Sequence, residues 1–311
     1  VEPGDEVVVC VNGVFGTRMA DIVGRIGGRL IRVEAPWGRA VDPEAVRKAV
    51  QGRKPKVLAV VHAETSTGVC QPLEELSRIA HHAGALFLVD TVTSLGGMEV
   101  AVDRLGIDAV YSGTQKCLSC PPGLAPLSFS PAALAALKNR NSPVVSWYLD
   151  MGLVGSYWGQ ERKYHHTAPI NMIYALREAL RIIAEEGLQA RFARHRLNHR
   201  ALVAGIEAMG LRMVVPPDER LPMLNTIYIP DGADDKRVRA ALLRDFGIEI
   251  GGGLGEFAGK AWRVGLMGHA ACRKNVMLLL AALATILKAE GVSVNPGALE
   301  AAAAEYAAGG A

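Results

Sequence analysis

Two short stretches decide how this chain folds: Phe87-Leu88-Val89-Asp90-Thr91-Val92 and, further on, Tyr111-Ser112-Gly113-Thr114-Gln115-Lys116. Each begins as a hydrophobic strand and runs into small polar residues. In an open α/β sheet, ligands bind where such strands end. Asp90 and Lys116 are therefore candidates for a ligand site.

Both residues also have ordinary interpretations. An Asp at a strand end can cap a helix or support a turn, and it can equally be the partner of a cationic group. Lysines are usually surface residues, but a lysine that leaves a buried strand is unusual. A desolvated lysine has a lowered pKa and can act as a nucleophile that forms a Schiff base.

The rest of the first half alternates strands with amphipathic helices. Hydrophobic runs at 7–11, 30–33, 57–61 and 86–89 predict buried strands, and apolar spacing near 3.6 predicts helices at 19–26, 43–50 and 73–83. This alternation predicts a mostly parallel sheet with flanking helices. Residues 109–112 and 125–129 follow each other without a helix between them, which predicts an antiparallel member of the sheet.

The second half is predicted to be helical over 169–209, with an interruption at Glu186-Gly187. Segments 211–215, 226–229, 235–246, 262–265 and 273–290 predict a smaller α/β layer, and the tail after Pro296 predicts a helix that frays. We therefore expect an α/β protein with a large domain at 1–187 and a small C-terminal α/β domain at 188–311.

The composition is that of an ordinary globular protein: 311 residues, 50% hydrophobic and 21% charged, with a net charge of +3. The arginines between Arg191 and Arg200 are interpreted as one solvated helix face, so nucleic-acid binding has no support. No apolar run reaches the length of a membrane span, and five cysteines without a repeating spacing favour the cytoplasm.

Further motifs occur in order along nearly the whole chain. They are Glu64-Thr65-Ser66-Thr67-Gly68, Val89-Asp90-Thr91-Val92 with Ser94-Leu95-Gly96-Gly97, Ser112-Gly113-Thr114-Gln115-Lys116, Tyr164-His165-His166-Thr167-Ala168-Pro169 and Arg263-Val264-Gly265-Leu266-Met267-Gly268. Together they resemble the class V, fold-type I aminotransferases, most nearly the alanine-glyoxylate and serine-glyoxylate (serine-pyruvate) enzymes. The resemblance implies pyridoxal 5'-phosphate as cofactor.

By the same resemblance, Lys116 forms the Schiff base with the cofactor and carries the proton in transamination. Asp90 holds the pyridine nitrogen protonated, so that the ring accepts electrons from the substrate. Phe15 takes the position of a Trp that stacks on the ring in many relatives, and Val92 packs on the opposite face.

The remaining roles concern the phosphate and the substrate. Thr65 is expected near the phenolic oxygen and Gln115 near the phosphate. Tyr164 and Thr167 resemble a pair that binds the phosphate of the neighbouring subunit's cofactor, which implies a homodimer with shared active sites. Arg263 resembles the arginine that grips the substrate's α-carboxylate, although from the residue alone a surface salt bridge would be expected.

The implied reaction is a ping-pong transfer of an amino group from alanine or serine to glyoxylate or pyruvate. A ureidoglycine-glyoxylate aminotransferase is an alternative that the motifs leave open. A cysteine-desulfurase-like lyase is disfavoured, since such relatives usually carry His where this chain has Gln115. A non-catalytic aminotransferase-like protein is the alternative from another class.

The resemblance also concerns what precedes the chain. Family members carry, ahead of the segment that matches Val1-Glu2-Pro3-Gly4-Asp5, an arm and a small-residue loop whose backbone N–H groups bind the cofactor phosphate. We therefore expect these 311 residues to be a truncated form with weakened cofactor affinity and dimer stability.

Three other motifs are given structural interpretations. Cys117-Leu118-Ser119-Cys120 has the spacing of a metal pair but lacks a second pair, which favours small buried thiols. Adjacent histidines His81 and His82 diverge on a helix and cannot readily share a metal. Gly251-Gly252-Gly253-Leu254-Gly255 lacks the residues of a phosphate loop and is expected to let a loop approach the active site closely.

Overall fold

The computed structural model describes residues 1–309, and its centre is a six-stranded sheet with the order β2-β1-β3-β6-β7-β8. The strands are β1 Glu6–Val11, β2 Arg29–Glu34, β3 Val57–Val61, β6 Leu86–Asp90, β7 Ala109–Tyr111 and β8 Leu127–Phe129. All neighbours pair in parallel except β7 and β8, which are antiparallel. The predicted parallel sheet with one antiparallel member is confirmed.

Helices cover both faces of this sheet, because successive side chains of a strand point to opposite faces and both faces are apolar. Val7, Val9 and Val11 of β1 pack toward α1, whereas Val8 and Cys10 pack toward α2 and α3. The helices are α1 Val14–Arg25, α2 Pro43–Val50 and α3 Glu74–His82, and a short hairpin of β4 Ala63–Glu64 and β5 Val69–Cys70 follows β3. Apolar side chains on both faces are typical of a buried parallel sheet.

The middle of the chain is helical. Ser130 and Asp150 accept hydrogen bonds from backbone N–H groups at the starts of α4 and α5, as helix-capping side chains do. The elements are α4 Pro131–Lys138, η1 Trp147–Leu149, α5 Met151–Trp158, α6 Ile170–Glu186 and α7 Leu188–Ala208. Gly187, with φ of 80°, separates α6 from α7, where the sequence predicts the interruption.

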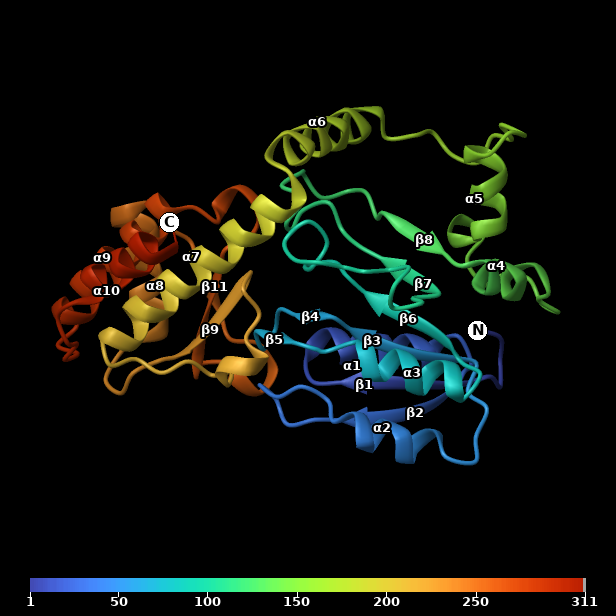
Figure 1. Cartoon of the computed structure of the whole chain (residues 1–311), viewed down its shortest axis with the longest axis horizontal. Coiled ribbons are helices and arrows are strands. Elements are labelled where there is room, and N and C mark those ends of the chain that lie inside the picture. The colour runs from blue at the N-terminus through green and yellow to red at the C-terminus, as the bar shows by residue number, and fades with distance from the viewer. Residues whose placement is uncertain (310–311) are drawn as a thin grey trace.

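The C-terminal part is a three-stranded sheet, β10-β11-β9, covered by helices. Its elements are η2 Pro217–Glu219, β9 Leu224–Tyr228, α8 Asp235–Phe246, β10 Gly251–Gly252, η3 Gly255–Phe257, β11 Ala261–Gly265, η4 Gly268–Ala270, α9 Arg273–Ala289 and α10 Ala298–Gly309. Figure 1 shows α7 running from the end of α6 into this group, away from the six-stranded sheet.

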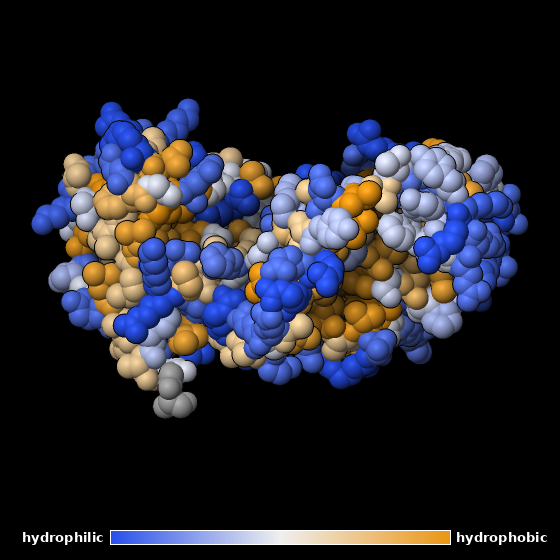
Figure 2. Space-filling view, turned by 90° about the horizontal axis from the view of Figure 1, so that it is seen from above, coloured by the Kyte–Doolittle hydropathy of each residue, from blue (hydrophilic) through white to orange (hydrophobic). Residues whose placement is uncertain are grey.

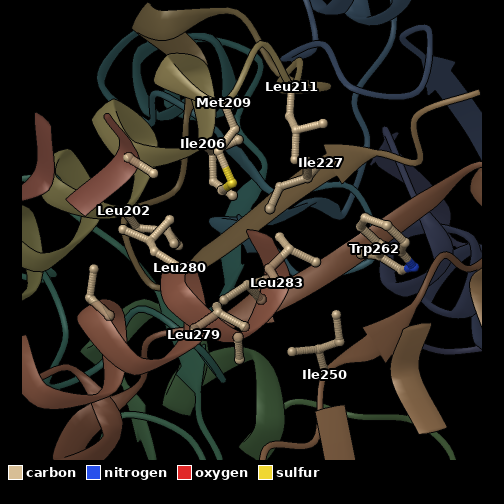
Figure 3. Close-up of a cluster of buried hydrophobic side chains, with 14 of the residues drawn as sticks. Leu202, Ile206, Met209, Leu211, Ile227, Ile250, Trp262, Leu279, Leu280 and Leu283 are labelled. Carbon is tan, nitrogen blue, oxygen red and sulfur yellow. The ribbon is translucent and has the colours of Figure 1, made fainter. Parts of the chain in front are cut away.

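A separate hydrophobic core holds the C-terminal part together. Leu202 and Ile206 of α7 meet Leu280 of α9 and the strand residues Ile227 and Trp262, all of which are fully buried (Figure 3). The predicted division at Gly187 stays a prediction, although this core draws only on residues beyond it. The expected fraying after Pro296 falls partly on 310–311, outside the described residues.

Two expectations are wrong. Segment 211–215 forms no continuous strand, because only Met213 makes a bridge, to Ile227, before the two prolines that follow Val215 turn the chain away. The arginine cluster of α7 is solvated only in part: Arg196 and Arg200 are exposed. Arg191, His195 and Asn198 are instead buried at helical spacing in the same stripe as Leu202. None of the helices within residues 1–309 is long and apolar enough to cross a membrane.

Candidate active site

Asp90 and Tyr111 mark the site at the carboxyl ends of two neighbouring strands. Asp90 ends β6, Tyr111 ends β7, and the two residues are paired in register. The Tyr111 hydroxyl donates to Asp90 Oδ2 at 2.8 Å, and the Val92 N–H donates to Oδ1 at 2.8 Å. Asp90 thus supports the turn after β6, and its role as the partner of a cationic group stays a prediction.

The Asp90 carboxylate is 7% exposed, and burial raises its pKa. Its two hydrogen bonds and the charges of Arg18 and Lys116 act in the opposite direction. A carboxylate has about four lone-pair sites, of which the hydrogen bonds occupy two. Asp90 can therefore accept a further donor, and a cationic one would offset the cost of its burial.

Lys116 lies in the loop after β7 and is half-buried. Desolvation lowers the pKa of its amine, and the positive charge of Arg263 lowers it further. The negative charge of Asp90 raises the pKa of the amine, but its effect is smaller. The neutral amine, which is the nucleophilic form, is thereby favoured.

Arg263 comes to the site from β11, in the C-terminal part. Its Nε donates to Gly252 O at 2.8 Å and its Nη1 donates to Thr65 O at 3.1 Å, and burial lowers the pKa of the guanidinium. A side chain at Gly251 would begin 3.1 Å from Nη2, so this glycine leaves room for the guanidinium, as expected for the loop. Because a guanidinium has five N–H donors, three remain for a ligand. Arg263 makes these backbone contacts rather than the alternative surface salt bridge.

One cavity of about 580 Å³ brings most of the predicted residues together. Its lining includes six of them: Phe15, Thr65, Asp90, Val92, Gln115 and Lys116. Valine, alanine, leucine and isoleucine side chains of α1 and the sheet form much of the remaining wall. Such an apolar cavity with a few converging polar groups suits a planar organic cofactor.

Tyr164 and Thr167 lie outside this cavity. Both are exposed in the segment before α6, and the Tyr164 hydroxyl lies 3.2 Å from Thr167 Oγ1. Their side chains are free to meet another molecule, in keeping with the partner-directed role that the resemblance implies.

Glu64 is a residue whose role sequence reasoning missed. It is fully buried, and its Oε2 accepts the N–H groups of Phe15 and Gly16 at 3.1 and 3.2 Å. Ser66 donates to Oε1 from its N–H and hydroxyl, and its Oγ accepts the Val14 N–H at 2.9 Å. Glu64 and Ser66 therefore cap α1 from another segment and hold Phe15 at the cavity wall.

Arg18 and Tyr111 were also missed. The Arg18 guanidinium lies 5.1 Å from the centre of the Phe15 ring, and its charge acts on Asp90. A signal for both was present: Arg18 is nearly one helical turn after Phe15, and Tyr111 opens the lysine motif. No local signal could show that Glu64 reaches α1, because this contact spans 48 and 49 residues.

The remaining motifs have structural surroundings. Cys117 and Cys120 are buried thiols, and burial raises the pKa of Cys117 to about 12. His81 contacts Asp108 at 3.2 Å, while Ser77 donates to the Leu105 carbonyl. Among residues 1–309, no group of three His, Cys, Asp or Glu side chains is arranged to hold a metal ion.

Comparison with known proteins gives consistent matches over nearly the whole chain. Residues 1–274 match the family described as aminotransferase class-V. The chain is 39% identical to (S)-ureidoglycine--glyoxylate transaminase of Bacillus subtilis, covering 98% of this chain and 78% of that protein. It is 41% identical to alanine--glyoxylate aminotransferase of Callithrix jacchus, covering 93% and 70%.

A solved structure agrees with these matches. The chain superposes on alanine--glyoxylate aminotransferase from Nostoc sp. with a TM-score of 0.90 and 50% identity, covering 92% of this chain and 76% of that one. The likeness therefore extends over nearly the whole chain.

The electrostatics of Lys116 lead to a prediction for the protein without added ligands. A lowered pKa means that Lys116 has a larger neutral fraction than an ordinary lysine at any pH below about 10. An amine-selective reagent should therefore label Lys116 with a pH profile shifted to lower pH than that of the exposed Lys54 and Lys236, as measured by peptide mass spectrometry. Arg263→Gln should move the Lys116 profile upward, because a neighbouring positive charge is removed. Coincident profiles for the three wild-type lysines would contradict this account.

Proposed function

This chain belongs to the class-V aminotransferase family, and from that premise we propose that it transfers an amino group from alanine or serine to glyoxylate or pyruvate. Membership makes it a pyridoxal-phosphate-dependent transaminase of fold type I. Glyoxylate is the acceptor named for both curated relatives described above, which is why we place it first.

The residues around the cavity fit pyridoxal phosphate. Asp90 is a buried carboxylate with room for one more donor, which suits a protonated pyridine nitrogen. Phe15 and Val92 would contact the faces of the ring, Thr65 its phenolic oxygen and Gln115 its phosphate. When bound, the cofactor supplies a carbonyl carbon that reacts with amines and an aromatic ring that withdraws electrons from the substrate's α-carbon.

The observation that carries the proposal is the arrangement of Arg263 beside Lys116. The guanidinium is fixed by Thr65 O and Gly252 O, which leaves N–H groups on Nη1 and Nη2 for a carboxylate. A substrate carboxylate held there would lie in the region from which the charge of Arg263 acts on the Lys116 amine. This arrangement suits amino acids and 2-oxo acids, the two substrate classes of a transaminase.

The reaction then assigns one task to each side chain. Arg263 would bind the substrate carboxylate and so fix the orientation of the α-carbon. The Lys116 amine, whose pKa is lowered, would take the α-proton and return it in the reverse half-reaction. Asp90 would accept the hydrogen bond of a protonated pyridine nitrogen. The donor leaves as a 2-oxo acid, and the acceptor then leaves as an amino acid.

A panel of donors tests the proposal against its alternatives. With cofactor added, alanine or serine and glyoxylate should give glycine, measured by mass spectrometry, faster than other pairs. Preferred turnover of ureidoglycine would support the purine-degrading alternative, and sulfide release from cysteine would support the lyase. If the protein with added cofactor showed no turnover and no absorbance band at about 420 nm, it would be a non-catalytic protein.

Replacing Arg263 with Lys tests the carboxylate site. A lysine keeps the charge but cannot offer two parallel hydrogen bonds, so the KM of both amino and oxo acids should rise about tenfold or more. Amines without a carboxylate should react as they do in the wild type. Unaltered amino-acid kinetics would remove Arg263 from the substrate site.

We also propose that the active chain is a homodimer with shared sites. Exposed apolar and aromatic side chains gather between η1 and α6: Trp147, Tyr148, Leu149, Leu153, Trp158, Tyr164, Ile170, Ile173 and Tyr174. Helix α6 lies uppermost in Figure 1, and Figure 2, seen from above, shows orange apolar side chains and a hollow among polar ones. A face of this kind is typical of a subunit interface. A second copy packed there would receive Tyr164 and Thr167 near its own cofactor phosphate.

Mixing two inactive variants tests the shared site. In a heterodimer of Lys116→Ala with the double variant Tyr164→Ala and Thr167→Ala, one site regains every native residue and the other carries all the changes. Random pairing should restore about a quarter of the wild-type activity, because about half of the dimers then hold one native site each. Full activity of the double variant alone, or no recovery on mixing, would contradict sharing.

A further inference from the structure

Arg191 and Arg194 of α7 have no role in the site described so far. Arg191 is 3% exposed, and a buried charge is costly unless it is paired and hydrogen-bonded. Its guanidinium contacts two backbone carbonyl oxygens and one carboxylate. Nη2 donates to Cys117 O at 2.5 Å, Nε donates to Gly96 O at 2.9 Å, and Nη1 contacts Glu186 at 2.6 Å.

These two carbonyl groups belong to the loops that carry the reacting residues. Cys117 directly follows Lys116, and Gly96 belongs to the Ser94–Gly97 stretch that follows the Asp90 motif. The loops are already in close contact, since a side chain at Gly97 would begin 2.6 Å from Cys117 Sγ. The planar guanidinium of Arg191 therefore joins the lysine loop to the loop after β6.

The next turn of α7 holds the segment that follows the Arg263 strand. Arg194 Nη1 donates to Gly268 O at 2.8 Å and to Ala271 O at 2.6 Å. His195 Nε2 accepts the Gly268 N–H at 2.9 Å, so its proton lies on Nδ1 and is donated to Arg191 O at 2.7 Å. Burial lowers the pKa of His195 to about 4, which keeps this neutral form.

Glu186 completes the arrangement from the end of α6. It contacts both arginines, and the Arg194 guanidinium, followed by Arg191, holds the pKa of Glu186 down at about 2 against its partial burial. We refer to Glu186, Arg191, Arg194 and His195 as the α7 cluster. A direct bond supplements it, from the His269 N–H to Ser119 Oγ at 2.9 Å, between the lysine loop and the Gly268 turn.

We propose that the α7 cluster is a positioning device that sets the separation of Lys116 from Arg263, with Arg191 as the residue that holds the lysine loop. The inference rests on the roles proposed for Lys116 and Arg263. Arg191 contacts neither substrate nor cofactor, and it acts by fixing the backbone on which the amine is carried. The α7 helix thereby connects the two halves of the site, one from the six-stranded sheet and one from β11.

Arg191→Lys separates positioning from simple stabilisation. A lysine keeps a positive charge opposite Glu186, but its single nitrogen replaces three guanidinium nitrogens that each reach a different acceptor. If the lysine loop loosens, kcat should fall about tenfold to a hundredfold with little change in the KM of alanine or glyoxylate, because a displacement of about 1 Å costs this much. A purely structural role would lower the unfolding temperature and leave kcat of the folded protein unchanged.

A second measurement does not need turnover. In cofactor-free protein, Arg191→Lys should shift the pH profile of Lys116 labelling upward, because a loosened amine regains water. Arg196→Lys, at an exposed position of the same helix, is the matched control and should match the wild type in both measurements. The labelling result does not depend on transamination. A failure of the proposed function can therefore be distinguished from a failure of the proposed role of the α7 cluster.

Glu186→Gln is the milder variant should Arg191→Lys not fold. It keeps an acceptor for Arg191 and removes the charge, so it should shift the profile in the same direction by less. An unchanged labelling profile and an unchanged kcat in a folded variant, whether Arg191→Lys or Glu186→Gln, would overturn the proposal.

Discussion

The structure depends on one unfavourable placement: the Lys116 amine is half-buried and near the positive charge of Arg263. Desolvation and like charge both favour the neutral amine, and neither would persist if the loop could move. The surroundings accordingly fix the loop from several sides. Arg191 binds the carbonyl of Cys117, and Thr65 O and Gly252 O hold Arg263. The fold thus keeps the Lys116 amine and the Arg263 guanidinium close together, as the proposed reaction requires.

Much of the fold could be predicted because its signals are local. The period-2 alternation of β1 and the helix-start signal at Pro43 predict elements that the structure contains. The antiparallel edge strand was predicted because no helical pattern separates its segment from the one that forms β7. The strand predicted at 211–215 was wrong. Its apolar residues have the pattern of a strand, but its backbone makes only a few hydrogen bonds to β9.

The site was predictable only in part, for a physical reason. Asp90 ends β6 and Lys116 lies in the loop that follows β7, so a local motif of strand and polar residues marks each of them. Glu64 and Arg191 act across long separations, on α1 and on the lysine loop. The charge of Arg191 suggested a solvated face, whereas its helical spacing with His195 and Leu202 places it in the buried stripe. Periodicity was the better guide, because hydrogen-bonded arginine can replace an apolar residue in a core.

The central claim is that Lys116 is the residue to which the cofactor binds. Borohydride reduction of the protein incubated with pyridoxal phosphate makes the linkage permanent, and peptide mass spectrometry then locates it. The account predicts one modified peptide, carrying the cofactor on Lys116, and no such peptide from the Lys116→Ala variant. Stoichiometric attachment to any other lysine, with Lys116 unmodified, would contradict it.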